Sequence, residues 1–203
     1  MKGAAAASGS HTLPQVEGAA TLRFEALGGE CELYAVDPAE SLEITAEWIQ
    51  TLHRQLTRFD AESELSRFNA RAGEWVEVSP ELEALLTAAL DAHETSGGLV
   101  HAGILPSLIG SGYDRTFSEL VHVDRHQNGV GRHRSGVETH ASPREAQLPP
   151  LPALLQVKKG AAKLKPGSSI DLGGLAKGWI ADRAVERMVP ISIANCGGDL
   201  SAI

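Results

Sequence analysis

The sequence predicts an α+β fold in which a mixed, largely antiparallel sheet is covered by helices. Strand-like alternation and helical apolar stripes interleave along the chain without regular βαβ order, which favours this fold class. With 203 residues, the chain is long enough for one substantial domain. Apolar residues make up 42% of the chain and aromatic residues only 4%, so the predicted core rests on Leu, Ala, Val and Ile.

Charge and hydropathy limit the possible partners. The formal net charge of -8 argues against non-specific nucleic-acid binding, which depends on basic patches that neutralise phosphates. No segment approaches the ~20 consecutive apolar residues of a membrane span. We therefore expect no nucleic-acid partner and no transmembrane segment.

Residues 1–18 are expected to form a disordered leader ahead of a domain that covers residues 19–203. The Ala/Ser/Gly-rich start, Met1 to Leu13, has one lysine and lacks the apolar stretch of a secretory signal. The two cysteines, Cys31 and Cys196, are far apart in sequence and are interpreted as small buried apolar residues, with no pairing assigned. These features favour a reduced, cytoplasmic setting.

The first elements are expected to be strands, followed by a long helix. Alternating apolar residues in Thr21–Val36 predict either two strands joined by a tight turn at Gly28–Gly29 or one strand with a glycine bulge. Asp37, Pro38 and Glu40 suit the N-cap, first and third positions of a helix. The apolar stripe of that helix is Leu42, Ala46, Ile49, Leu52, Leu56 and Phe59.

The middle of the chain predicts a short strand over Trp75–Val78 and a second helix opened by Ser79–Pro80–Glu81. That helix buries Leu82, Leu85, Leu86, Ala89 and Leu90 and ends at Gly97–Gly98. A shorter helix is expected over Ile104–Ser111. Residues 121–152 show neither the helical nor the strand periodicity of apolar residues, which predicts an irregular surface excursion. Its histidines, His122, His126, His133 and His140, are interpreted as solvated rather than as a zinc site, since zinc sites are more tightly spaced.

The last third predicts a strand and turn over Leu164–Asp171, a helix over Gly174–Met188 and a strand over Ile191–Ala194. Gly173–Gly174 removes side chains directly before a helix whose first free N–H groups suit an anion. Lys177, one turn later, could reach a phosphate, and Asp171 could bind a polar edge or orient the loop. The alternative is a plain strand–turn–helix with Lys177 and Asp182 on its solvated face.

Asp171-Leu-Gly-Gly-Leu-Ala-Lys-Gly-Trp-Ile-Ala-Asp182 resembles the central motif of the ApbE-type flavin transferases, D-L-G-G-I-A-K-G-Y-A-V-D. Three further segments agree in order and spacing. They are Arg58-Phe-Asp-Ala-Glu-Ser-Glu-Leu-Ser-Arg-Phe-Asn69, the helix that starts after Val78 and ends in Ser96-Gly-Gly98, and Ala194-Asn-Cys-Gly-Gly-Asp-Leu200. The resemblance covers Thr21 to Ile203 except for residues 121–152.

The resemblance implies a site for FAD together with Mg²⁺. It implies that Asn69 lies near the adenine end, although a helix C-cap or turn is the alternative role of this amide. Gly173, Gly174 and Lys177, with Asp171 upstream, would lie around the pyrophosphate. The carbonyl of Ala176 would contribute to the Mg²⁺ site, since hard cations prefer oxygen ligands. The floor under the flavin would be formed by Asn195, Gly197, Gly198 and Asp199.

The resemblance also implies a reaction, the Mg²⁺-dependent transfer of FMN from FAD to a threonine of an acceptor protein with release of AMP. The alternative is a non-catalytic FAD-binding or structural homologue. Two departures favour that alternative: the catalytic groups are expected beyond residue 203, and Val100-His-Ala-Gly103 replaces the family's F-D-P-T. Gly29 also stands where the family has a threonine. His101 could then contact a ligand or be a partly buried structural histidine.

Overall fold

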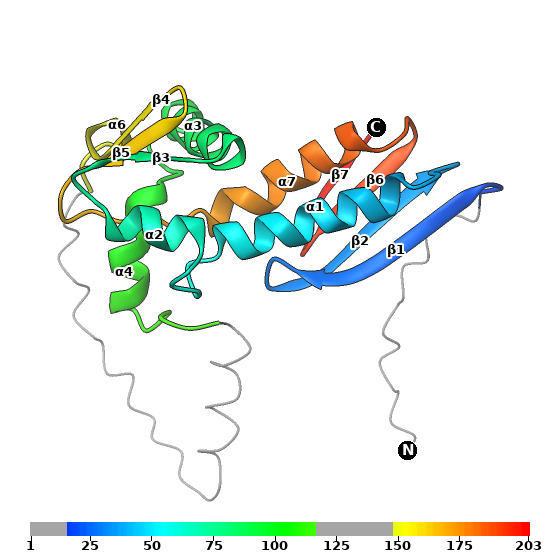
Figure 1. Ribbon diagram of the computed structural model, residues 1–203, viewed down its shortest axis with the longest axis horizontal. Helices are drawn as coiled ribbons and strands as arrows, with labels where there is room; N and C mark the ends of the chain where they lie inside the picture. The colour runs from blue at the N-terminus through cyan, green and yellow to red at the C-terminus, as the bar shows by residue number, and fades with distance from the viewer. Residues whose placement is uncertain (1–15, 117–147) are drawn as a thin grey trace, which may run out of the picture.

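The computed structural model describes residues 16–116 and 148–203, which form two antiparallel sheets (Figure 1). The larger sheet has the order β1-β2-β6-β7. Its strands are β1 (Ala19–Ala26), β2 (Gly29–Val36), β6 (Ser192–Cys196) and β7 (Asp199–Ala202). The smaller sheet has the order β3-β5-β4, from β3 (Trp75–Glu77), β5 (Ala161–Leu164) and β4 (Leu155–Lys158). The α+β class is confirmed, with two sheets in place of the single one expected.

The glycine-rich segment after β1 forms a hairpin, which decides between the two interpretations left open by the sequence. Ala26 lies opposite Gly29 in the register of β1 and β2. Leu27 and Gly28 both have positive φ, 56° and 82°, as a two-residue type I′ turn requires. The backbone N–H of Leu27 donates to Nδ1 of His53 over 3.2 Å, so the following helix holds this strained turn in place.

The first helix, α1 (Ser41–Leu56), begins later than the sequence predicted. Asp37 is not its N-cap: the N–H of Asp37 donates to the carbonyl of Gly18, and Asp37 itself has φ 50°. The chain uses this left-handed backbone to turn from β2 into the helix. The predicted apolar stripe is correct from Leu42 to Leu56 and wrong at Phe59, because Thr57 is extended and the helix has ended.

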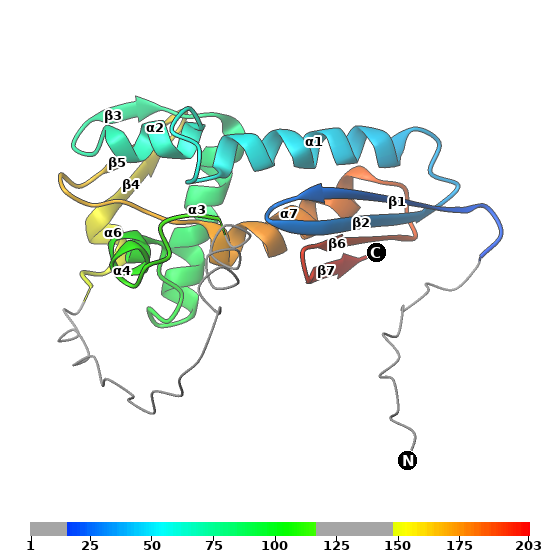
Figure 2. The ribbon, with the colours of Figure 1, turned by 90° about the horizontal axis from the view of Figure 1, so that it is seen from below.

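Helix α1 and helix α7 (Gly173–Arg187) lie side by side on one face of the larger sheet (Figures 1 and 2). Helix α1 packs against β1 and β2, while α7 packs against β6 and β7. Strands present alternate residues to one face, and on this face the central strands bury Cys31, Leu33, Ala35, Ser192, Ala194 and Cys196. The main core therefore lies between this face and the two helices.

The other half of the molecule surrounds the smaller sheet with further helices. They are α2 (Glu64–Ala70), α3 (Pro80–Thr95), the 3-10 turn η1 (Ala102–Ile104), α4 (Leu105–Gly110) and α6 (Leu151–Leu154). The predicted start of α3 is confirmed, since the Ser79 hydroxyl accepts from the N–H of Leu82 and Pro80 is the first helical residue. Within the described residues, no helix is long and apolar enough to span a membrane.

The predicted excursion over residues 121–152 is wrong at its end. Leu151 is fully buried and begins α6, so irregular structure stops before Pro152. Residues 121–147, with the four histidines, and residues 1–15 of the expected leader lie outside the described residues. Strands β4 and β7 were not predicted, because four residues are too few for their alternation of apolar and polar residues to stand out. The strand expected within Leu164–Asp171 lies earlier, since β5 ends at Leu164.

Leu33, at the centre of β2, supplies a test of this core. Leu33→Ala should lower the free energy of unfolding by about 2–5 kcal/mol, because it leaves a cavity under a side chain that is 0% exposed. Urea denaturation measures the change. Ile44→Ala is the matched control: Ile44 is 62% exposed on α1, and a loss within about 0.5 kcal/mol is expected. Equal losses in the two variants would contradict the assignment of the core face.

Candidate functional site

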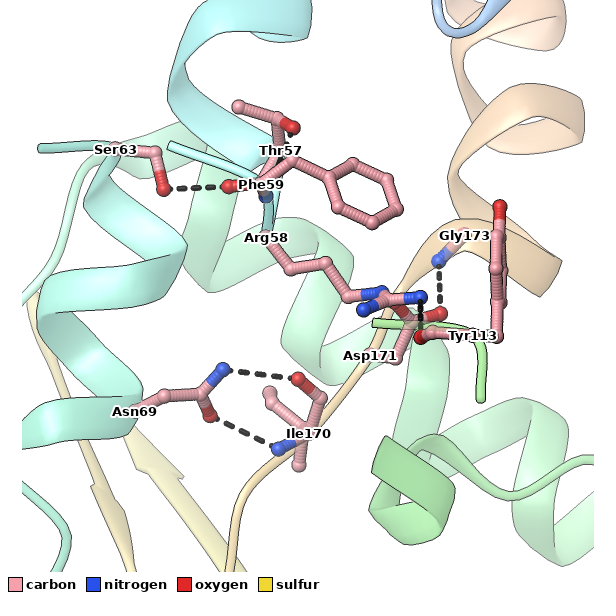
Figure 3. A network of polar contacts seen from close by, with 9 residues as sticks. All are labelled: Thr57, Arg58, Phe59, Ser63, Asn69, Tyr113, Ile170, Asp171 and Gly173. Atoms are coloured by element: carbon pink, nitrogen blue, oxygen red, sulfur yellow. Dashed lines mark hydrogen bonds and ion pairs between the residues drawn. The ribbon is translucent and has the colours of Figure 1, made fainter. Parts of the chain in front are cut away.

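The segment from Lys165 to Leu172 leads from the smaller sheet to the start of α7, and Asn69 fastens it. The Asn69 side chain, in the last turn of α2, donates from Nδ2 to the carbonyl of Ile170 and accepts at Oδ1 from its N–H, both at 2.9 Å (Figure 3). Asn69 thus pairs with a backbone unit as a strand residue would, rather than acting as a C-cap. Each amide atom keeps one further hydrogen-bonding position, so its place near the adenine end stays a prediction.

Asp171 orients the loop before α7 through both of its carboxylate oxygens. Oδ1 accepts from the N–H of Gly173 at 2.9 Å, and Oδ2 pairs with Nε of Arg58 at 2.9 Å (Figure 3). The side chains of Arg58 and Asp171 are only 7% and 15% exposed. A charge-assisted pair so shielded from water is strong only while both partners are present. Of the two roles considered for Asp171, the structure shows loop orientation.

Arg58 is held between two aromatic rings, a contact that the sequence did not predict. Its guanidinium carbon lies 4.2 Å from the ring centroid of Phe59 and 4.5 Å from that of Tyr113. A terminal guanidinium nitrogen also donates to the carbonyl of Tyr113 at 2.7 Å. Arg58 therefore joins the end of α1 to the segment after α4 and to the start of α7. Its position at the head of the Arg58–Asn69 motif was the one signal that could have found it.

The start of α7 is only partly free to bind an anion. The Gly173 N–H is taken by Asp171, and the N–H groups of Leu175 and Ala176 donate to the carbonyl of Leu172. Among the described residues, none accepts from the N–H of Gly174. A β-carbon at Gly174 would meet no atom within 4 Å, so there is open space beside it. The predicted anion site is thus narrowed to one backbone donor next to that space.

Four predicted residues gather at the hairpin that follows α7, and Lys177 lies over it. Gly197 and Gly198 form the turn between β6 and β7 with φ of 63° and 105°. The Asn195 side chain accepts from the N–H of Gly198 at 2.9 Å. The ammonium of Lys177 is 3.3 Å from where a β-carbon on Gly197 would lie. A side chain at position 197 would press on the lysine ammonium, and the positive φ of Gly197 also favours glycine.

The same hairpin places Asp199 against the second turn of α7. A β-carbon on Gly178 would lie 3.9 Å from Oδ1 of Asp199, so helix and hairpin approach closely. Lys177 is four residues after Gly173, about 6 Å along the helix axis. The predicted cofactor-binding residues of both motifs therefore line the first turns of α7. Asp182, further along, is exposed, as the plain interpretation of this helix expected.

The described residues do not fit a magnesium site by themselves. Ala176 is a buried residue inside α7, and its carbonyl supplies a single oxygen. In the described ranges, no group of three or more His, Cys, Asp or Glu side chains is placed to hold a metal ion. Mg²⁺ demands near-octahedral oxygen coordination. The role of Ala176 as a ligand stays a prediction that needs oxygens from elsewhere.

His101 is a structural residue in the described structure. Its Nδ1 accepts from the N–H of Gly103 at 3.0 Å, and its Nε2 lies 2.9 Å from the carbonyl of Pro149. The first contact caps the 3-10 turn η1. Where the family pattern has aspartate, the imidazole thus supplies the acceptor at the start of this turn. The ring of His93 packs edge-on against that of His101, with centroids 4.8 Å apart.

Solved structures that share this fold include flavin transferases. The chain is similar to the ApbE protein of Thermotoga maritima MSB8, with a TM-score of 0.67 and 22% identity over 91% of this chain and 59% of that one. It is also similar to the flavinyl transferase ApbE of Pseudomonas stutzeri in its apo form, with a TM-score of 0.66 and 16% identity over 91% and 58%. For the flavin transferase ApbE of Vibrio cholerae, the TM-score is 0.67 and the identity is 16%, over 91% of this chain and 59% of that one.

The fold is therefore that of the flavin transferases, and the motifs around α7 occupy one region of it. A family model, the ApbE family, matches residues 27–203, and the chain belongs to that family. No curated protein matches it. The chain spans about three-fifths of the length of these solved structures.

The Arg58–Asp171 pair supplies a test of this arrangement. Arg58→Met should lower the free energy of unfolding by about 3 kcal/mol, because it leaves the Asp171 carboxylate shielded and unpaired. Arg71→Met is the matched control, since Arg71 pairs with Glu74 at the surface, with both side chains more than half exposed, and should change stability by less than about 1 kcal/mol. Urea denaturation measures both. Similar small losses would show that the pair does not hold the loop.

Proposed function

We propose that this chain binds FAD at the first turns of α7 and is part of an FAD:protein FMN transferase. The observation that carries the proposal is that Lys177 lies against the Gly197–Gly198 turn, one helical turn after Gly174, whose N–H has no acceptor among the described residues. Membership of the ApbE family and the flavin transferase fold support it. The activity, the FAD substrate and the acceptor protein are all parts of this proposal.

The physical argument concerns the pyrophosphate of FAD. A backbone N–H at a helix N-terminus favours negative charge, and the Lys177 ammonium adds a full positive charge one turn later. The glycines of the turn let the ligand approach the backbone closely. Asp171 already fills the Gly173 donor, so the pyrophosphate would lie beside Gly174, where the space is open.

The remaining predicted residues would contact the two ends of the dinucleotide. Asn69 has one unused donor and one unused acceptor on its amide, which suits the edge of an adenine. Asn195 and Asp199 flank the glycine turn on the other side, under the expected flavin position. A dinucleotide bound in this way would extend along the first turns of α7, from α2 to the β6–β7 turn.

The proposed reaction moves the FMN phosphoryl group. The hydroxyl oxygen of an acceptor threonine attacks the phosphorus of the FMN half, and the bond from that phosphorus to the bridging oxygen breaks. AMP leaves with the bridging oxygen, and the hydroxyl proton passes to a base. In this chain, Lys177 and Gly174 N–H would stabilise the charge on the phosphate oxygens. The expected Mg²⁺ dependence is part of the proposal and requires ligands in addition to Ala176.

A second candidate, a non-catalytic FAD-binding protein, is favoured by the absence of a metal-ligand cluster among the described residues. Both candidates share the binding site, and one experiment separates them. Purified chain is titrated with FAD while flavin fluorescence is followed, and AMP is then measured with Mg²⁺ present. Saturable quenching with AMP release supports the transferase, and quenching without AMP supports the binder. Absence of quenching contradicts both.

Lys177→Ala tests the placement of the phosphates. The variant should weaken FAD binding about tenfold at 0.01 M salt and only about twofold at 1 M salt, because the lost contact is a screened charge–phosphate attraction. Lys158→Ala is the matched control: Lys158 lies over the ring of Trp75 in the smaller sheet, and its loss should leave the affinity unchanged. Equal weakening by Lys177→Ala at both salt concentrations would contradict the contact.

A further inference from the structure

The two cysteines of the sequence, distant in the chain, lie directly opposite each other in the larger sheet. Cys31 of β2 faces Cys196 of β6 in the antiparallel register. The next pair along is Glu30 and Gly197, and the N–H of Gly197 donates to the carbonyl of Glu30 at 3.2 Å. Hydrogen-bonded and non-hydrogen-bonded pairs alternate, so the cysteines form a non-hydrogen-bonded pair, with a Cα separation of about 4.5 Å.

That spacing falls within the range of ~4.4–6.8 Å that disulfides accept. Both side chains also point to the same face, because residues opposite each other in a sheet project to the same side. Both are 0% exposed, and both are free thiols. The β-carbons of such a pair lie close to the separation that a disulfide spans.

The two thiols are chemically unequal. The Cys31 thiol donates to the carbonyl of Ala26 at 3.7 Å. The neighbouring Cys196 thiol lowers the pKa of Cys31 against the opposing effect of burial, and the N–H of Gly197 and the charge of Lys177 contribute in the same direction as Cys196. The Cys31 thiol and burial raise the pKa of Cys196. Cys31 is therefore the thiol that ionises first, and Cys196 is positioned beside it as the resolving thiol.

We propose that Cys31 and Cys196 are a redox-active pair that forms a cross-strand disulfide between β2 and β6 on reaction with a small-molecule disulfide such as oxidised glutathione. The Cys31 thiolate attacks one sulfur of the reagent, forming a mixed disulfide and releasing one thiol. Cys196 then attacks Sγ of Cys31 and releases the second. The two cysteines lose two electrons and two protons, which appear in the two small-molecule thiols.

Two structural consequences follow from this bond. It would tie the start of the Gly197–Gly198 turn, and hence the neighbouring Asn195 and Asp199, covalently to β2. It would also close a loop that contains α1, the smaller sheet and α7, and long loops gain most from closure. Because both thiols are buried, exchange proceeds while the chain folds or while the sheet opens locally. The proposal does not depend on FAD binding.

The test compares disulfide formation in the folded and the unfolded chain. Full chain is equilibrated in glutathione buffers of graded ratio, once from reduced chain refolded from urea and once from oxidised chain. Free thiols are then blocked and counted by mass. The equilibrium constant for the intramolecular disulfide should be at least about a hundredfold larger in the folded chain than in urea, as expected for a long loop closed without strain.

A folded-state constant equal to or below the urea value would overturn the proposal, since it would mean that the native sheet resists the bond. Glutathione adducts on both cysteines, or a dimer linked between chains, would overturn it as well. Cys31→Ser and Cys196→Ser are matched controls that differ from the chain by one sulfur each. Each should retain one thiol and give a single-glutathione adduct at most.

Discussion

The arrangement of the molecule depends on how the segment before α7 is held. Asn69 binds both backbone groups of Ile170, and Asp171 next to it pairs with Arg58. These contacts come from α2 and from the end of α1, so one short stretch connects the smaller sheet with α1 and α7 (Figure 3). The direction in which α7 leaves, and therefore the position of Lys177, follows from them.

The same contacts give the start of α7 a mixed electrostatic character. The helix N-terminus attracts anions, yet its own Asp171 carboxylate already occupies one donor and is neutralised by Arg58. A bound phosphate would therefore meet a carboxylate whose charge is balanced, with Gly174 and Lys177 still available. Such a site would bind a phosphate less tightly than a bare helix end, but its donors are already held in place by Asp171 and Arg58.

The sequence predicted the elements with strong local signals. The apolar stripe of α1, the N-cap of α3 and the start of α7 at its glycine pair were all predicted, because each depends on residues that are close together in the sequence. The contacts that build the site were not predicted. Arg58 and Tyr113 are far apart in the sequence, and no pattern of neighbouring residues indicates that they are in contact. Asn69 and Asp171 were named through the family motif, yet their bonds to backbone and to Arg58 required the structure. Strand β7 was missed because four residues of an exposed edge carry little periodicity.

The order of strands in the larger sheet has a consequence for how the chain is made. Strand β2 is completed early in synthesis, but its neighbour β6 comes near the end of the described chain. The smaller sheet and its helices are synthesised between these two strands, and the residues that pair in the smaller sheet are closer in sequence than those of β2 and β6. A nascent chain would thus hold the β1–β2 hairpin with one edge unpaired until β6 is synthesised. Pairings between distant residues slow folding, so the β2–β6 pairing is the step at which chaperone assistance would matter most.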